Sequence, residues 1–245
     1  MSDVLTLTLV RVRVAGPTTC ILEADLDDAP FHFRAGQAVV MGVHGHAVRQ
    51  PYSIACAPAD VQRTHRLEFL VGVDAREGAH FARLPPGVKL DVEGPCGSFV
   101  LPDVLEARPL LFVGGGTGIA PLRSMIREAL ARQHPAPITL LYSARRPAEF
   151  SYLDEFRRLM RHGRLRLVLT VTRPAGPRWR GERGRITRAL IERVVQPARS
   201  SSSKAEGRDV EAFLCGSPTF VSDLAQLVRQ IGVPTTRIHI ERWHD

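Results

Sequence analysis

The chain has 245 residues, and its 33 Lys and Arg exceed its 25 Asp and Glu, which gives a formal net charge of +8. A hydrophobic fraction of 44% and a mean hydropathy of −0.06 are typical of globular proteins. The basic balance favours an anionic partner in general, but no motif that reads nucleic acid is present. Four widely spaced cysteines argue against a zinc site, a cysteine-ligated iron–sulfur cluster and a disulfide scaffold, so we expect no metal. No apolar run could span a bilayer and no signal peptide opens the chain, so we expect a cytoplasmic protein that binds no membrane.

The first hundred residues show the alternating pattern of β-strands. Apolar residues alternate from Leu5 to Val14, with a change of register at Leu9-Val10 that indicates a bulge. Further short apolar runs lie between segments rich in Gly and Pro, at 20–22, 38–43, 52–56, 67–73 and 89–92. Short strands at this spacing predict an antiparallel β-barrel or sandwich.

After Pro109 strands and helices alternate. Strands are predicted at 110–113, 138–142, 165–171, 212–215 and 238–240, and helices up to Arg132 and at 150–161, 187–194 and 219–230. This order predicts a parallel, doubly wound α/β sheet. We therefore expect two domains, residues 1–104 and 105–245, and a mobile surface loop over 199–208.

The strongest local signal is the run Gly114-Gly115-Gly116-Thr117-Gly118-Ile119-Ala120-Pro121 between a predicted strand and a predicted helix. Glycines there let the backbone approach a pyrophosphate, and the helix N-terminus stabilises its charge. No Lys-Ser or Lys-Thr follows, so this is not a P-loop. A tight turn without a ligand is the alternative interpretation.

This loop resembles the pyridine-nucleotide signature of the plant-type ferredoxin–NADP(H) reductase superfamily. Four further segments occur in the family's order: Phe33–Gln37, Gln50–Ser53 in the place of R-x-Y-S, Gly94–Phe99, and Leu214–Pro218, which is similar to C-G-x-P. The resemblance covers nearly the whole chain and is nearest to the short bacterial reductases that serve ferredoxin or flavodoxin. It implies an antiparallel β-barrel that binds FAD, followed by an α/β domain that binds NADP(H).

The resemblance also implies the site residues. The residues expected to contact FAD are Gln50, Pro51, Tyr52, Ser53, Val71, Gly72, Val73, Gly78, Ala79, His80, Gly94, Gly97 and Ser98. Those expected to contact the nucleotide are Gly115, Gly116, Thr117, Gly118, Pro121, Ala144, Arg145, Thr172, Arg173, Arg185, Cys215, Gly216, Ser217 and Pro218. Trp243 is expected to stack on the flavin face that the nicotinamide must reach, and so to compete with the nicotinamide. The expected catalytic set is Tyr52, Ser53, Cys215, Glu241 and Trp243.

Several of these residues have ordinary alternatives. Tyr52 and Ser53 could be plain strand residues, and Cys215 a buried structural cysteine. Glu241 could be a solvated surface residue, and Trp243 could pack against the last strand. The three arginines at 145, 173 and 185 could be solvated, although guanidinium groups suit the 2′-phosphate that distinguishes NADP(H) from NAD(H).

Two positions depart from the family pattern. Gln50 stands where the family has an arginine for the FAD pyrophosphate, and Arg49 lies one residue early, so on a strand it faces the other way. Phe81 stands where the family has a Ser or Thr. Both departures bear on FAD affinity.

The function implied is an FAD-dependent oxidoreductase that moves hydride from NADPH to FAD and single electrons to ferredoxin or flavodoxin, reversibly. The basic charge suits an acidic carrier, and we expect a monomer. One alternative is the reductase component of a multicomponent oxygenase system. Another, of a different class, is a nucleotide-responsive binding module without redox turnover.

Overall fold

The computed structural model describes residues 4–73, 78–195 and 209–243. The predicted loop over 199–208 therefore lies outside the described residues. Met1–Asp103 with Ala120–Gln133 form a first compact unit, and Val104–Ile119 with His134–Asp245 form a second. Among the described residues, no helix has both the length and the apolar character that crossing a membrane requires.

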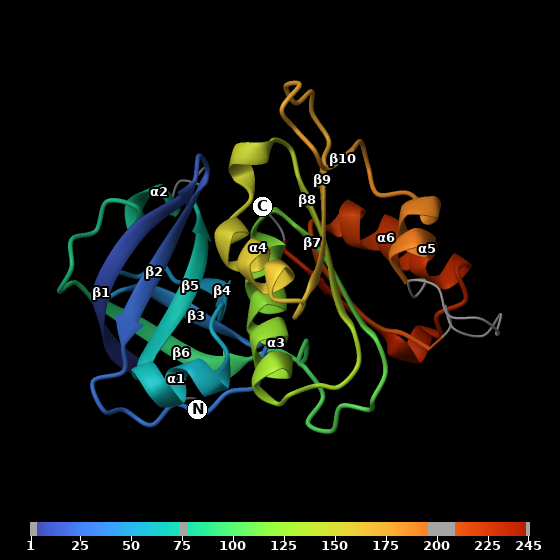
Figure 1. The fold of residues 1–245 in the computed structure, drawn as a ribbon. Helices are drawn as coiled ribbons and strands as arrows, with labels where there is room; N and C mark the ends of the chain where they lie inside the picture. The colour runs from blue at the N-terminus through green and yellow to red at the C-terminus, as the bar shows by residue number, and fades with distance from the viewer. Residues whose placement is uncertain (1–3, 74–77, 196–208, 244–245) are drawn as a thin grey trace. The chain divides into compact units, whose positions relative to one another are not determined.

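The first unit is built on a six-stranded antiparallel sheet in the order β4-β3-β6-β1-β2-β5 (Figure 1). An antiparallel bridge between Ile54, just past β4, and Phe69 in β5 joins the two edges of the sheet and closes it into a barrel. The strands are β1 (Val4–Gly16), β2 (Thr19–Asp25), β3 (Ala38–Val43), β4 (Gln50–Ser53), β5 (Arg66–Gly72) and β6 (Lys89–Cys96). The predicted antiparallel β-barrel is confirmed.

Two details of the barrel follow from the sequence pattern. The pairing of β1 with β2 shifts between Leu9 and Arg11, at the predicted change of register. Leu7 and Leu9, which are buried, and Leu22 and Phe69 on the facing strands, belong to one core cluster inside the barrel. The short helices α1 (Pro58–Thr64) and α2 (Gly78–Phe81) flank β5, and the sequence pattern had not indicated either.

The second unit contains a six-stranded sheet in the order β10-β9-β8-β7-β11-β12, with all its strand pairs parallel. Its elements are β7 (Leu110–Gly115), β8 (Ile138–Ala144), α4 (Leu153–Arg161), β9 (Arg166–Val171), β10 (Glu182–Arg183), α5 (Arg188–Val195), β11 (Glu211–Gly216), α6 (Pro218–Gln230) and β12 (Ile238–Arg242). The predicted parallel α/β sheet is confirmed, with the two-residue β10 as an unpredicted addition.

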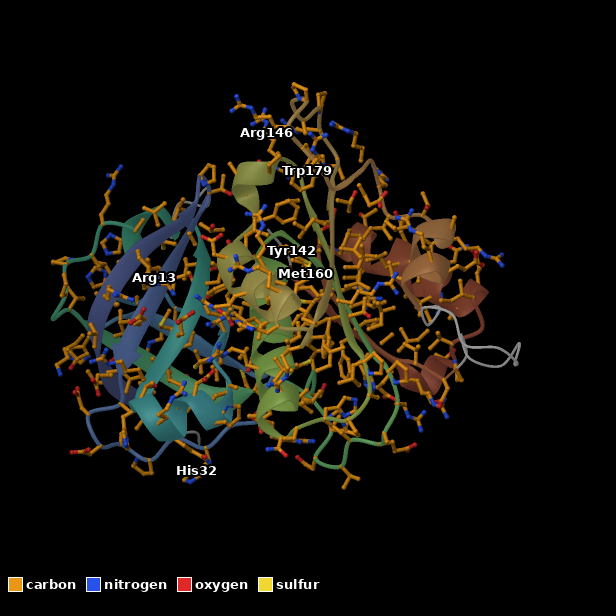
Figure 2. All side chains as sticks on the ribbon, viewed as in Figure 1. Arg13, His32, Tyr142, Arg146, Met160 and Trp179 are labelled. Atoms are coloured by element: carbon orange, nitrogen blue, oxygen red, sulfur yellow. The ribbon has the colours of Figure 1, made fainter. Side chains whose placement is uncertain are left out.

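Helices cover both faces of this sheet. Leu141 of β8 packs in a cluster with side chains of α5 and α6. Its neighbour Tyr142 (labelled in Figure 2) points to the other face, as alternation along a strand requires, and meets Phe156 of α4 edge to face. Helix α6 begins directly after the carboxyl end of β11, at the edge of the sheet where doubly wound folds bind ligands.

Helix α3 (Ile119–Ala131) follows directly after the 3-10 turn η1 (Gly116–Gly118). From Ala120 onward it belongs to the first unit. The sequence division at residues 104 and 105 had assigned this helix to the α/β domain, and that division stays a prediction.

Candidate functional site

The glycine loop sits at the carboxyl end of β7. Gly116 has φ +56°, and nothing lies within 4 Å of the point where its Cβ would be. At Gly118 a Cβ would lie 2.5 Å from the backbone oxygen of Cys215, so only glycine allows the loop to approach β11 this closely. The loop is thus packed against one strand and open on its other side, which fits a pyrophosphate cradle.

Cys215, Glu241 and Trp243 meet beside this loop. Cys215 pairs with Glu241 across the parallel strands β11 and β12, and the Trp243 backbone N–H donates to the Gly216 oxygen at 3.0 Å. Burial, and then the charge of Glu241, raise the pKa of the fully buried Cys215 thiol well above its usual value. The thiol is therefore protonated at neutral pH.

The alternative interpretation of Glu241, as a solvated surface residue, is wrong. Its Oε2 is buried, as is Trp243 Nε1, and among the described residues neither atom has a hydrogen-bond partner of normal geometry. Burial raises the pKa of Glu241 to about 7. The Trp243 side chain opposes part of this rise, and it also lowers the pKa of Cys215, so the three groups interact beside the open loop. A polar ligand there would complete the hydrogen bonding of the two buried atoms.

Phe220 is a residue that the sequence analysis missed. A Cβ on Gly115 would lie 3.0 Å from its ring and a Cβ on Gly216 would lie 2.7 Å from it. The half-buried ring therefore borders both glycine turns. Its position two residues after Pro218, in the first turn of α6, is the signal that could have revealed it. Ser217, directly before Pro218, is exposed at the N-cap of α6.

The predicted arginines follow the ends of neighbouring strands. The Thr172 and Arg173 N–H groups donate to the backbone oxygens of Ala144 and Arg145, at 3.0 and 2.9 Å. The Gly184 N–H donates to the Val171 oxygen at 2.8 Å, which brings Arg185 to the same edge. All three arginine side chains are exposed, and no ion pair joins them to a carboxylate in the described part of the chain.

The predicted flavin strand lies at the edge of the barrel. In β4, Gln50 and Pro51 are exposed, Tyr52 is half-buried and Ser53 is buried. The Tyr52 ring meets Phe81 edge to face, with centroids 5.6 Å apart. Phe81 is only 4% exposed, so this departure from the family pattern places an aromatic residue in the barrel core.

Arg49 does not take the role of the missing arginine at Gln50. Its Nη2 lies 3.1 Å from Asp91 Oδ2, and His44 Nδ1 lies 2.7 Å from Asp91 Oδ1. The hydrogen bond from His44, with a smaller effect of Arg49, lowers the pKa of Asp91. The guanidinium is thus held by a carboxylate of β6.

The remaining predicted flavin contacts lie at the end of β5, in α2, and in β6 and the turn that follows it. Val71 and Gly72 end β5, the Val73 N–H donates to the Thr18 oxygen, and Gly78, Ala79 and the exposed His80 belong to α2. Gly94 lies in β6, and beyond it Gly97 has φ +92° with nothing within 4 Å of its Cβ position, followed by the exposed Ser98. This open turn fits a cofactor that approaches the backbone closely.

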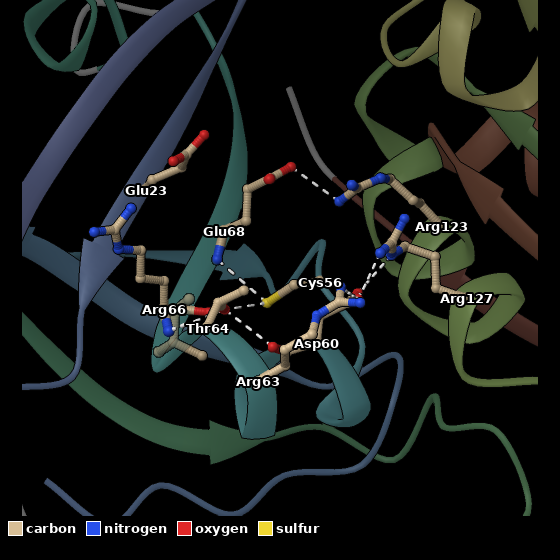
Figure 3. A pocket seen from close by; sticks show the side chains of 10 residues that line it. Glu23, Cys56, Asp60, Arg63, Thr64, Arg66, Glu68, Arg123 and Arg127 are labelled. Atoms are coloured by element: carbon tan, nitrogen blue, oxygen red, sulfur yellow. Dashed lines mark hydrogen bonds and ion pairs between the residues drawn. The ribbon is translucent and has the colours of Figure 1, made fainter. Parts of the chain in front are cut away.

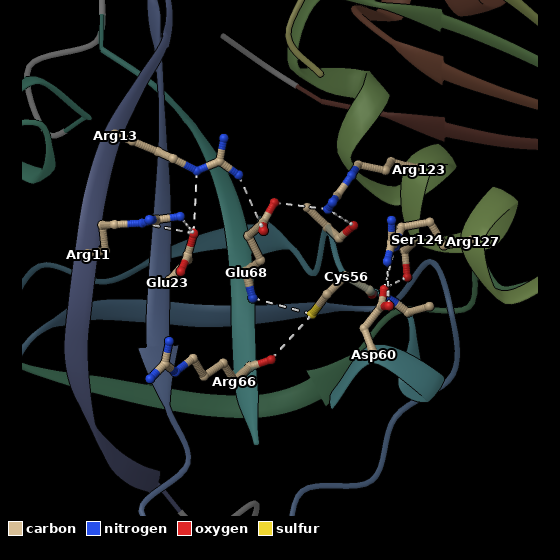
Figure 4. Close-up of polar contacts among 12 residues, drawn as sticks. Arg11, Arg13, Glu23, Cys56, Asp60, Arg66, Glu68, Arg123, Ser124 and Arg127 are labelled. Atoms are coloured by element: carbon tan, nitrogen blue, oxygen red, sulfur yellow. Dashed lines mark hydrogen bonds and ion pairs between the residues drawn. The ribbon is translucent and has the colours of Figure 1, made fainter. Parts of the chain in front are cut away.

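A group of buried contacts holds the segment that follows β4. Arg123 of α3 is 6% exposed, and its Nη1 donates to the Ala55 oxygen at 2.8 Å and to Glu68 at 2.9 Å. The Ser124 hydroxyl donates to the Cys56 oxygen at 2.6 Å, and Arg127 binds both oxygens of Asp60 (Figure 4). The polar groups of 55–60 are thus tied to α3.

A shallow pocket opens beside this segment (Figure 3). Its charged walls come from Glu23, Asp60, Arg63, Arg66, Glu68, Arg123 and Arg127. These groups are bound to one another or to neighbouring strands, and burial raises the pKa of the Cys56 thiol at its base to about 12. The pocket is therefore an assembly of internal ion pairs.

Comparison with known proteins places these features in a family. The model of an oxidoreductase NAD-binding domain matches residues 112–226. Ferredoxin–NADP reductase B of Sorangium cellulosum is 36% identical over 244 residues, which cover 96% of each chain. The chain belongs to the ferredoxin–NADP(H) reductase superfamily.

Two further relatives agree with this membership. The reductase subunit of an aromatic O-demethylase from Amycolatopsis is 33% identical over 87% of this chain, which spans 62% of that protein. A ferredoxin–NADP⁺ reductase from Neisseria gonorrhoeae, solved with FAD and NADP, has a TM-score of 0.79 at 22% identity and covers 99% of each chain. The predicted superfamily, its oxidoreductase activity and its cofactor pair FAD and NADP(H) are confirmed at the level of the family.

Proposed function

We propose that this protein transfers hydride from NADPH to FAD and passes the electrons singly to a protein carrier. The observation that carries the proposal is the open loop Gly116–Gly118, packed against Cys215 beside the buried Glu241. An ordinary βα turn requires neither that close approach nor two buried polar atoms without partners. Family membership favours redox turnover over a binding module that only senses nucleotides.

In the first unit, the chain's own residues would hold and orient the flavin. Tyr52 offers its half-buried ring as an apolar wall, and the Ser53 hydroxyl at the end of β4 can exchange a proton with a neighbouring nitrogen. The turn containing Gly97 and Ser98 offers backbone groups at the barrel edge. When bound, FAD supplies the exchange between two-electron and one-electron chemistry.

In the second unit, the glycine loop and the start of α3 would hold the pyrophosphate of the nucleotide. Cys215 keeps its proton and is fully buried, so it would support the glycine loop without acting as a base. Glu241, with a pKa of about 7, can hold or release a proton at its carboxyl group near neutral pH. Trp243 stands next to it and would border the nicotinamide.

The exposed arginines at 145, 173 and 185 support NADP(H) over NAD(H). They follow the ends of neighbouring strands, and no carboxylate neutralises them in the described residues. A 2′-phosphate would supply the negative charge that they lack, through charge-assisted hydrogen bonds.

For the electron acceptor we propose ferredoxin or flavodoxin, because the relative from Sorangium is a ferredoxin–NADP reductase that matches this chain from end to end. The net charge of +8 suits an acidic carrier. The reductase subunit of the demethylase favours a second candidate, delivery of electrons to an oxygenase component. We propose a monomer in both cases.

The purified protein tests the proposal. We expect a yellow protein whose flavin absorbance bleaches under anaerobic titration with NADPH and recovers on addition of an oxidised carrier. Reoxidation by ferredoxin or flavodoxin supports the first candidate, and reoxidation only by an oxygenase component supports the second. A colourless protein that takes up no added FAD would contradict both.

A further inference from the structure

The loop between β9 and β10 carries a tryptophan that is fixed on three sides (labelled in Figure 2). The Trp179 ring stacks on the buried Phe150 ring, with centroids 5.7 Å apart and an interplanar angle of 8°. Its Nε1 donates to the Glu182 oxygen at 2.9 Å. A Cβ on Gly181 would lie 2.4 Å from Trp179 Cζ2, so the neighbouring position accommodates only glycine.

This tryptophan is the sole aromatic residue in a loop of arginines. Arg173, Arg178, Arg180 and Arg185 are exposed, and no ion pair joins them to a carboxylate among the described residues. Glu182, the acid at the start of β10, is paired with Arg193 of α5. The Arg183 side chain of β10 donates to the Ala175 and Gly176 oxygens of the loop. Because like charges repel, we expect the loop to need the apolar anchor of Trp179 as well to hold one conformation.

Further contacts connect the stacked rings of Trp179 and Phe150 to the glycine loop. Phe150 meets Tyr142 edge to face, with centroids 4.9 Å apart. The Tyr142 hydroxyl accepts from the Ser151 N–H at 3.2 Å and donates to the Gly116 oxygen in a long hydrogen bond of 3.4 Å. Three rings therefore form a column (Trp179, Phe150 and Tyr142, the aromatic column) from the arginine loop to the predicted pyrophosphate loop.

We propose that Trp179 is a positioning residue that selects a 2′-phosphorylated nucleotide. Through the aromatic column it holds the arginine loop at a fixed distance from the glycine loop, so both phosphate-binding ends are ordered before the ligand arrives. Preorganisation lowers the entropy lost on binding. Because the arginine loop would contact only the 2′-phosphate, this gain would apply to NADP(H) and not to NAD(H). The inference rests on the proposed use of NADP(H) and names the residue that determines it.

The test compares Trp179→Ala with Trp179→Phe, which keeps an aromatic ring over Phe150. For each we measure binding of 2′,5′-ADP and of 5′-AMP, and kcat/KM with NADPH and NADH. Trp179→Ala should weaken 2′,5′-ADP binding about tenfold and leave 5′-AMP and NADH nearly unchanged, and Trp179→Phe should restore most of the loss. Tyr142→Phe, at the other end of the aromatic column, should affect both nucleotides alike.

Trypsin supplies a readout that needs no nucleotide. The alanine variant should be cut faster at Arg178 and Arg180, because the loop has lost its anchor, whereas the phenylalanine variant should resemble the wild type. Equal losses for NADPH and NADH in Trp179→Ala, or no change in either assay, would overturn the inference while leaving the proposed function intact. A wild-type protein that binds 5′-AMP as tightly as 2′,5′-ADP would instead refute the proposed NADP(H) preference, and with it the selecting role.

Discussion

Two groups of arginines, one in each unit, differ in whether a carboxylate pairs with them. In the first unit, around Cys56, Arg13, Arg66, Arg123 and Arg127 each bind a carboxylate of a neighbouring element. At the strand ends of the second unit, the exposed arginines of the loop have no carboxylate partner in the described residues. The excess charge of the chain is therefore concentrated where an anionic ligand can use it.

Burial explains the pairing of Arg123, whereas the side chains of Arg13 and Arg66 are paired although they are 41% and 45% exposed. Arg123 is almost completely buried, and a buried charge must be paired because leaving water is costly. An exposed arginine keeps its hydration and can remain unpaired until a phosphate arrives. The same residue type thus stabilises the fold in one unit and, as we propose, recognises a ligand in the other.

The largest expected effect tests how much the paired, buried Arg123 stabilises the fold. Arg123→Met removes the donor to the Ala55 oxygen and the nearer of the two arginines paired with Glu68, and should reduce the free energy of unfolding by about 3–5 kcal/mol. The matched change Arg180→Met, at an exposed position, should shift it by less than about 0.5 kcal/mol. Urea unfolding followed by circular dichroism measures both. Similar losses of unfolding free energy in the two variants would show that the buried and the exposed arginine contribute equally to stability.

Arg173→Ala and Arg185→Ala test the proposed role of the exposed arginines. Each removes one charge-assisted contact to the 2′-phosphate, about 1.5–3 kcal/mol, and should lower kcat/KM for NADPH about ten- to a hundredfold. Stability and kcat/KM for NADH should stay nearly unchanged, since neither side chain is paired. A preference for NADH in the wild type would show that the arginines have another purpose.

Glu241 extends the comparison because it is a largely buried acid that no arginine of the described residues neutralises, unlike Asp60, which Arg127 binds. Its folded pKa of about 7 exceeds the ordinary value of 4.5, so the folded state binds the proton more tightly than the unfolded state. Its contribution to stability is complete below pH 4.5 and is lost as the pH rises to 7 and above. In Glu241→Gln this fall, on the order of 2 kcal/mol after allowance for partial exposure, should disappear from the pH profile of thermal unfolding.

The smallest effect concerns the exposed Gln50 at the barrel edge. Gln50→Arg would add an exposed, unpaired arginine to the first unit, where it could bind the FAD pyrophosphate. Because a charged donor bonds to phosphate more strongly than an amide, the variant should lose FAD on dilution about fivefold more slowly. Fluorescence of released flavin measures the rate. As a control, Gln50→Lys adds the charge without the guanidinium fork. Faster release from the arginine variant would mean that the local site is built in another way.

The sequence predicted the strands well where local patterns specify them. The range Ala38–Val43 matches β3 residue for residue, and the register change at Leu9-Val10 corresponds to the irregular pairing of β1. The glycine loop and the order of strands and helices after Pro109 were equally clear, because each depends on neighbours in the chain.

What the sequence did not reveal depends on contacts between distant residues. Arg123 and Ala55 are 68 positions apart, so nothing local shows that α3 holds the segment after β4. Trp179 and Phe150 belong to two loops, and their stacking appears only once the parallel sheet aligns the strand ends. Burial of Glu241 likewise follows from the pairing of β11 with β12, which a single strand pattern cannot show.

The four cysteines differ in a way that offers an experimental handle. Cys20, Cys56 and Cys215 are buried, and burial raises the pKa of each thiol, whereas Cys96 is exposed and forms no disulfide. A maleimide reagent at neutral pH should therefore modify Cys96 alone, because the thiolate is the reacting form. A dye attached there would stand directly before Gly97 and Ser98, and its emission could report flavin uptake in real time without any change to the chain.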